Sequence, residues 1–260
     1  MMEKSKEKYF GVGEVPIGIG AQLKGWDVTE EHIRNAENLP LVDFLAMTHK
    51  CPHNCPHCFT CRHIKTLGKE KIFEIIDQLA DMNTHAINYV GEGEPVLDPD
   101  FFDILSYTSF KGIIPVVFTD GATRMTDRDF VRRVKATGAS VVPKCDSLYN
   151  EKYQNWVLHS DPENDGNYYD YDTWELAPDK KSMFQGRNRA IQILMEGGFN
   201  EVSPDGTTRM GFDMLITKRN MHEISDILKY CRKNNLWIVF AFYLTSGGSG
   251  GDDFDMSMAL

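Results

Sequence analysis

A strand-length apolar run leads directly into a cysteine-rich segment, and this stretch decides the fold: residues 41–61 read LVDFLAMTHKCPHNCPHCFTC. Its first seven residues are long enough for one buried strand. Cys51, Cys55 and Cys58 follow at intervals that would place them on one face of a helix, but Pro56 would interrupt that helix. We therefore predict a strand that ends in a loop carrying three closely spaced thiols.

An alternation of apolar runs and helix-like segments continues through the rest of the chain. A parallel crossover needs about a dozen residues and usually uses a helix, so the alternation predicts an α/β fold with a mainly parallel sheet and outer helices. Six units fit an open sheet or a partly closed barrel, with chemistry at the carboxyl ends of the strands. The expected strands are Leu41–Met47, Ala86–Val90, Ile113–Phe118, Ser140–Val142, Met210–Ile216 and Leu236–Leu244, and the expected helices are Lys69–Met82, Asp100–Ser109, Thr126–Thr137, Phe184–Glu196 and Met221–Asn234.

Segments that do not fit the alternation set the expected domain boundaries. Residues 1–40 are an N-terminal extension with a Gly-rich stretch, and a helix over Thr29–Glu37 is expected to cap one end of the domain. Residues 41–245 form the α/β domain itself. Within it, residues 159–181 are rich in Asp, Glu and aromatic side chains and are interpreted as an insertion after the fourth strand. Residues 246–260 are expected to be a mobile tail.

The composition is that of a soluble globular protein, with 42% hydrophobic and 25% charged residues among 260. This balance excludes disorder over the whole length. The net charge of −10 argues against nucleic acid as the main partner. No apolar run is long enough to cross a membrane, and the first residues lack the apolar core of a signal peptide. We therefore expect a cytoplasmic protein with no membrane partner.

The crowded cysteines indicate a metal site. Four of the six cysteines fall within residues 51–61, which in a chain without a secretion signal favours metal binding over disulfides. Three thiolates in such a loop are able to ligate three corners of a [4Fe–4S] cube and leave one iron open for a ligand. Zinc is the alternative, because the same region also offers four histidines. Zinc sites, however, usually use a second Cys pair, and none follows downstream.

The CxxxCxxC spacing of Cys51, Cys55 and Cys58, in a loop after the first strand, resembles the signature of the radical S-adenosylmethionine (radical SAM) enzymes. The resemblance implies a partial (β/α)6 barrel. It also implies a [4Fe–4S] cluster on these three cysteines, with SAM bound at the open iron. His57 stands just before the third cysteine, where the family often has an aromatic residue. Cys61 is then expected to be a buried thiol beside the cluster.

A glycine-rich acidic turn after the second strand strengthens the resemblance. The run Gly91-Glu92-Gly93-Glu94-Pro95 is similar to the family's GGEP motif, with Glu92 in place of its first glycine. Glycines let the backbone approach a small ligand, and a carboxylate accepts hydrogen bonds from an ammonium group. The resemblance implies that this edge of the sheet holds the methionyl amino group of SAM.

The third and fourth strands end in polar residues that resemble further SAM-contacting positions of the family. Thr119 and Asp120 follow the third strand, with Asp120 where Asn is usual. After the fourth strand, alternation places Lys144 and Asp146 on one face and Cys145 on the other, so we favour the pair over the cysteine. The candidate catalytic residues are Lys144, Asp146 and Cys145, and the candidate SAM-binding residues are Gly91, Glu92, Gly93, Glu94, Pro95, Thr119, Asp120, Lys144 and Ser147.

The resemblance implies an enzyme that cleaves SAM reductively to a 5′-deoxyadenosyl radical, which removes a hydrogen atom from the substrate. A reductant such as flavodoxin or ferredoxin would supply the electron. The Gly-Glu-Gly-Glu-Pro form and the residues after it look like radical SAM proteins of natural-product sugar pathways, as in antibiotic biosynthesis. The implied reactions are dehydration, epimerisation or oxidation, catalysed by a lyase or an oxidoreductase. Epimerisation needs a hydrogen donor, for which Cys145 and Cys61 are candidates.

The substrate is expected to be small, polar and cationic, of the amino-sugar kind. This expectation rests on residues 159–181, whose carboxylates and aromatic rings would form a lid that attracts such a ligand. Two alternatives stay open. One is a radical SAM enzyme that acts on a peptide or a nucleotide. The other is a zinc-binding structural module, in which the cysteine loop holds zinc and the acidic segment recruits a basic partner.

Overall fold

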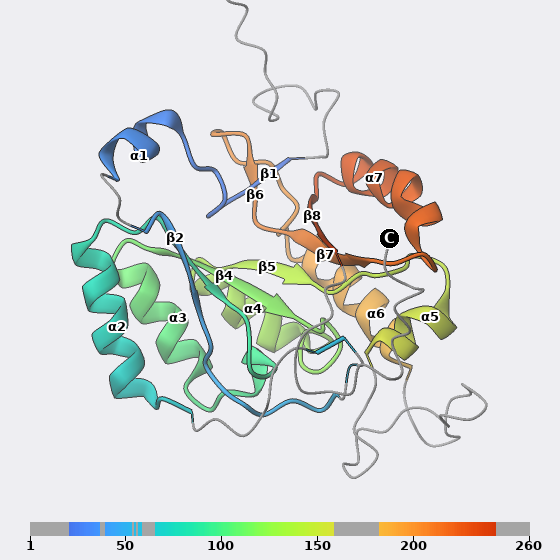
Figure 1. Cartoon of the computed structure of the whole chain (residues 1–260), viewed down its shortest axis with the longest axis horizontal. Helices are drawn as coiled ribbons and strands as arrows, with labels where there is room; N and C mark the ends of the chain where they lie inside the picture. The colour runs from blue at the N-terminus through green and yellow to red at the C-terminus, as the bar shows by residue number, and fades with distance from the viewer. Residues whose placement is uncertain are drawn as a thin grey trace, which may run out of the picture.

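Six parallel strands organise the computed structural model, which describes residues 21–36, 40–53, 55, 57–58, 66–158 and 182–242. Figure 1 shows the strands as one layer, with α2 (Lys69–Asp81) and α3 (Phe101–Phe110) beside its first strands and α7 (Ile224–Lys233) beside its last. Several expectations lie outside the described residues: the Gly-rich stretch, Cys61, the acidic insertion and the tail.

The strand order confirms the expected α/β class. Strands β2 (Val42–Leu45), β3 (Ala86–Tyr89), β4 (Ile114–Thr119) and β5 (Ser140–Pro143) pair in parallel in that order. Strands β7 (Gly211–Ile216) and β8 (Trp237–Phe242) form a second parallel pair. Two parallel bridges, Val141 to Met210 and Lys144 to Asp213, join β5 to β7. The result is a six-stranded parallel layer of the kind that a partial barrel contains, with β2 and β8 at its ends.

Helices connect the strands, as expected for parallel crossovers. Side-chain caps explain where two of them begin: the Asp127 carboxylate accepts from the N–H groups of Asp129 and Phe130, and the Ser182 hydroxyl accepts from the N–H of Gln185. The first residues of the described chain contribute a two-residue strand and one short helix. The remaining elements are α1 (Glu30–Asn35), η1 (Pro95–Leu97), α4 (Arg128–Ala136), α5 (Glu151–Val157), α6 (Met183–Glu196) and η2 (Met221–Glu223).

The main core lies between the outer face of the strands and the helices. Alternate strand residues point to opposite faces, so Ile87, Val117 and Val141 meet the helical layer and are fully buried there. Apolar residues at helical spacing supply the other half of this core, which explains why these segments fold as helices. They include Ile76 of α2, Ile104 of α3, Val134 of α4, Leu194 of α6 and Ile227 of α7.

A second apolar cluster fills the inner side of the sheet at the amino-terminal ends of the strands. It joins Leu23, Ala86, Val116, Val142 and Trp237. Leu23 belongs to β1 (Gln22–Leu23), which pairs in parallel with β6 (Thr207–Thr208). Because this apolar cluster fills the amino-terminal side, space for a cavity is left at the carboxyl ends of the strands. Within the described part of the chain, no helix has the length and apolar character needed to span a bilayer.

Candidate active site

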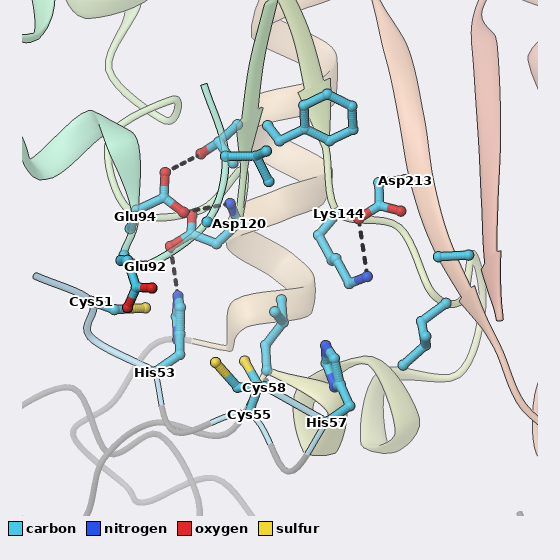
Figure 2. A pocket seen from close by; sticks show the side chains of 18 of the residues that line it. Cys51, His53, Cys55, His57, Cys58, Glu92, Glu94, Asp120, Lys144 and Asp213 are labelled. Carbon is cyan, nitrogen blue, oxygen red and sulfur yellow. Dashed lines mark hydrogen bonds and ion pairs between the residues drawn. The ribbon is translucent and has the colours of Figure 1, made fainter. Parts of the chain in front are cut away.

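A cavity of about 500 Å³ opens at the carboxyl ends of the strands (Figure 2). The cysteine loop forms one part of its wall, and the turns after β3 and β4 form another. Inward-facing side chains of β7 and β8 complete it with an apolar surface. The apolar lining residues are Val90, Phe118, Leu158, Leu215, Ala241 and Phe242.

The three signature cysteines all line this cavity. The N–H of Cys58 donates to the carbonyl of Cys55 over 3.0 Å, which forms a turn within the segment where Pro56 predicts a loop in place of a helix. Among the described residues, no group of three or more His, Cys, Asp or Glu side chains is placed to hold a single metal ion. A [4Fe–4S] cube takes each cysteine on a different iron, and all three thiols line the same cavity.

At Gly93 the turn after β3 packs closely against the start of the cysteine loop. A Cβ atom at this position would lie 2.5 Å from the carbonyl oxygen of Lys50 and 2.6 Å from that of Thr48. The neighbouring Glu94 N–H donates to the same Lys50 carbonyl over 2.8 Å. Only glycine permits this approach of two backbone segments, which gives a physical reason for the second glycine of the motif.

Glu94 ties the turn after β3 to the turn after β4. The Thr119 hydroxyl donates to its Oε1 over 2.6 Å, and the Asp120 N–H donates to its Oε2 over 2.7 Å. The side chain is buried, and burial together with the charge of Asp120 raises the pKa of Glu94 well above its usual value. Glu94 therefore organises the cavity wall through bonds inside the protein.

His53 and Asp120 connect the cysteine loop to the turn after β4. His53 Nε2 lies 2.6 Å from Asp120 Oδ2, and both side chains are buried. Burial by itself would raise the pKa of Asp120, but the charge of His53 and several hydrogen bonds outweigh it, and the pKa is lowered. The N–H groups of Ala122 and Thr123 donate to the other carboxylate oxygen over 2.6 and 2.8 Å. Asp120 thus holds the loop that carries the cysteines.

Glu92 offers a carboxylate oxygen to the cavity. Its Oε2 atom is buried and has no hydrogen-bond partner among the described residues. Figure 2 shows the side chain beside Cys51, on the side of the cavity opposite Lys144. A buried carboxylate oxygen without a partner is unfavourable unless a ligand donates to it. The substitution of Glu for the first glycine of the motif therefore adds an acceptor for a cationic group.

Lys144 projects into the cavity from the end of β5. Its Nζ lies 3.1 Å from Asp213 Oδ2 and 3.4 Å from Asp146 Oδ1. Burial by itself lowers the pKa of Lys144, but the charges of Asp146 and Asp213 outweigh burial and raise it. Asp213 was not among the sequence candidates. An acidic residue inside the apolar run of β7 was the signal that could have identified it.

Four sequence candidates lie outside the cavity lining. Cys145 faces the helical layer, where the guanidinium of Arg187 donates to its sulfur, and burial raises the pKa of this thiol to about 11. Ser147 donates to the Glu223 carboxylate over 2.7 Å. Asp146 is fully buried, and Pro95 begins η1. The side chains of Cys145, Asp146 and Ser147 are thus bonded to other protein groups and do not line the cavity. The candidates that line the cavity are Gly91, Glu92, Gly93, Glu94, Thr119, Asp120 and Lys144.

Residues 45–170 match the model of the radical SAM superfamily. The chain contains a radical SAM domain. Radical SAM proteins use a [4Fe–4S] cluster and SAM. The described residues of this domain fit both groups, because three thiols share one cavity with the buried oxygen of Glu92, which has no hydrogen-bond partner among these residues.

Radical SAM relatives resemble this chain over most of its length. An S-adenosylmethionine-dependent nucleotide dehydratase from Flammeovirga pacifica is 23% identical over 82% of this chain and 66% of that protein. An AdoMet-dependent heme synthase from Nitratidesulfovibrio vulgaris is 22% identical over 82% of this chain and 51% of that protein. The chain thus spans about one half to two thirds of the length of these two relatives.

Solved radical SAM structures share the fold. SuiB from Streptococcus suis, bound to S-adenosylmethionine, superposes with a TM-score of 0.59 at 17% identity, over 84% of this chain and 45% of SuiB. Methylornithine synthase superposes with a TM-score of 0.53 at 16% identity, over 89% of this chain and 65% of that protein. At these identities the likeness concerns the fold alone, and it agrees with the partial barrel expected from the βα alternation.

Proposed function

We propose that this chain is a radical SAM enzyme, with a [4Fe–4S] cluster on Cys51, Cys55 and Cys58 and SAM in the adjoining cavity. One observation carries the proposal. Three thiols line a single cavity that has, on one side, a carboxylate oxygen with no partner in the described part of the chain and, on the other, a lysine ammonium. This combination suits a metal cluster next to a zwitterionic amino acid, which is the form of the methionyl part of SAM.

Glu92 and Lys144 would each bind one charged group of the methionyl part of SAM. Glu92 would accept from the methionyl ammonium group, because its Oε2 is buried and no described residue donates to it. Lys144 would pair with the methionyl carboxylate from the opposite side of the cavity. Gly91 and Gly93 both line the cavity, and Gly93 lets the turn after β3 pack against the start of the cysteine loop, so that both segments lie beside the ligand. Thr119 and Asp120, held by Glu94, would complete this part of the wall.

When bound, the cluster and SAM supply one-electron cleavage of the sulfonium and hydrogen-atom abstraction from the substrate. The protein's part is to position the substrate and to exclude water from it. The apolar surface of Phe118, Leu158, Leu215 and Ala241 serves both purposes. A flavodoxin or a ferredoxin would supply the electron. We place the protein in the cytoplasm, because the cysteine ligands need a reducing compartment.

For the substrate we propose a small polar molecule with a cationic group, of the amino-sugar kind. The support is local charge: near the cavity, the single positive charge of Lys144 faces two carboxylates, those of Asp146 and Asp213. An excess of negative charge attracts an amine and disfavours a phosphate-rich nucleotide. The reaction would be a dehydration, an epimerisation or an oxidation at a carbon that bears a hydroxyl group.

Anaerobic reconstitution of the wild-type protein with iron and sulfide tests the proposed function. We expect a brown protein with a broad absorption band at ~400 nm from iron–sulfur charge transfer. After reduction with dithionite it should convert SAM to 5′-deoxyadenosine and methionine, measured by liquid chromatography. A colourless protein that retains zinc and leaves SAM intact would establish the structural zinc module instead.

Glu92→Gln is expected to weaken SAM binding by about tenfold, because a neutral amide replaces the carboxylate that faces the ammonium group. Equilibrium dialysis of SAM against the reconstituted, unreduced protein measures the change. Glu70→Gln, an exposed residue of α2, is the matched control and should leave the dissociation constant unchanged. Equal affinities for the Glu92 variant and the wild type would remove Glu92 from the SAM site.

A further inference from the structure

We propose that Asp213 is a resident counter-ion of Lys144 that the carboxylate of SAM displaces. This inference rests on the proposed function, because it assumes that SAM enters the cavity. It assigns a role to a residue that no sequence motif indicated. Asp213 would hold the lysine in position before SAM binds and would become available to a second ligand afterwards.

The first observation is the position of the ion pair. The Lys144 and Asp213 side chains both line the cavity, and Figure 2 shows them together on the wall opposite Glu92. The distance from Lys144 Nζ to Asp213 Oδ2 is 3.1 Å, and the lysine side chain is only 14% exposed. A buried lysine is unfavourable without a paired anion, so a resident carboxylate partner stabilises Lys144 before SAM arrives.

The second observation is that the two carboxylates around Lys144 are not equivalent. Asp146 is fully buried, and its Oδ1 accepts from the Leu215 N–H over 2.7 Å. Its other oxygen lies 3.4 Å from Gln154 Nε2. Asp213 bonds through Oδ2 alone, since no bond to its Oδ1 is formed by any described residue, and its side chain is 22% exposed. Asp146 is therefore fixed, and Asp213 is the exchangeable partner.

The third observation is local charge. Lys144 carries one positive charge against two carboxylates, so a third carboxylate from SAM would enter an already negative environment. Like charges repel strongly in a partly dry cavity. The repulsion falls if the Asp213 side chain turns away from Lys144. Its backbone stays in place, because the Asp213 carbonyl accepts from the Cys145 N–H over 2.8 Å. The exchange is thus a side-chain rotation at a fixed point of β7.

The exchange has a consequence for the substrate. Once SAM occupies Lys144, the Asp213 carboxylate has lost its cation and faces the cavity. An ammonium or hydroxyl group of the substrate would then satisfy it. SAM and a cationic substrate would therefore each favour the binding of the other.

Binding of SAM and of decarboxylated SAM, which lacks the methionyl carboxylate, tests the exchange on the reconstituted, unreduced protein by equilibrium dialysis. Asp213→Asn removes the competing charge and is expected to tighten SAM binding by about fivefold. It should not tighten the binding of decarboxylated SAM. Lys144→Met should weaken the binding of SAM and leave that of decarboxylated SAM unchanged. Asp226→Asn, an exposed position on α7, removes the same charge away from the cavity and is the matched control.

The outcomes separate this inference from the proposed function. If the wild type binds SAM and Asp213→Asn binds it no more tightly, the exchange is wrong and the proposed function stands. Equal tightening of SAM and decarboxylated SAM would also contradict the exchange, because the effect would not depend on the carboxylate. A wild-type protein that holds its cluster but binds no SAM contradicts both proposals. The absorbance of each variant shows whether its cluster is loaded.

Discussion

Cys55→Ala is expected to abolish both the iron–sulfur absorbance and the cleavage of SAM. Cys55 is the middle residue of the three thiols that line the cavity, and a [4Fe–4S] cluster that loses one of three protein ligands loses its attachment. Iron content after anaerobic reconstitution and the yield of 5′-deoxyadenosine measure the two effects. We expect both to fall to the background of a protein without a cluster.

Cys231→Ala is the matched control for this prediction. Cys231 is fully buried on α7, does not line the cavity, and burial raises its pKa. Its replacement removes a thiol and leaves a small void, which costs stability but does not touch the cluster. We therefore expect normal iron content in this variant. Full cluster loading of the Cys55 variant, or equal loss in both variants, would contradict the assignment of the ligands.

Gly93→Ala is expected to lower the free energy of unfolding by about 3 kcal/mol and to reduce cluster loading. The added Cβ would lie 2.5 and 2.6 Å from two backbone carbonyl oxygens, and backbone cannot rotate away as a flexible side chain can. The turn after β3 and the start of the cysteine loop must therefore separate. Urea unfolding followed by circular dichroism measures the stability, and absorbance measures the cluster.

Gly68→Ala separates this steric effect from backbone strain. Gly68 has a φ of +82°, where a side chain is disfavoured, but a Cβ there would meet no atom within 4 Å. Its replacement should cost about 1 kcal/mol and leave the cluster intact. A Gly93 variant as stable as the wild type would show that the two backbone segments are free to move apart.

Strands and helices with a strong apolar pattern were predictable from the sequence. Strand β7, expected at Met210–Ile216, begins one residue later in the structure, and α6 begins one residue before its expected start. Helix α5 was missed because its buried positions include Gln154 and Asn155, which read as a polar loop. Gln154 is buried because its Oε1 accepts from the N–H groups of Asp146 and Ser147. Burial of this kind follows from tertiary hydrogen bonds and not from hydrophobic periodicity.

The candidate site was predictable where a motif or an alternation marked it. Side-chain alternation separated Lys144, which lines the cavity, from Cys145, which faces the helices. Alternation placed Asp146 on the same face as Lys144, but Asp146 does not line the cavity. Strand β5 ends at Pro143, and the chain then turns so that the Asp146 carboxylate accepts from the Leu215 N–H. Asp213 belongs to a strand 69 residues further along, and its pairing with Lys144 depends on β5 and β7 becoming neighbours.

The buried bonds among His53, Asp120 and Glu94 also bear on the order of assembly. His53 and Asp120 are 67 residues apart in the sequence, and Glu94 and Thr119 are 25 apart. Contacts between such distant residues form late, after the intervening strands have docked. We therefore expect the bond between His53 and Asp120, which ties the start of the cysteine loop to the turn after β4, to form only on a largely folded protein. We expect iron to be inserted into a preformed scaffold, in contrast to small zinc domains, whose metal drives their folding.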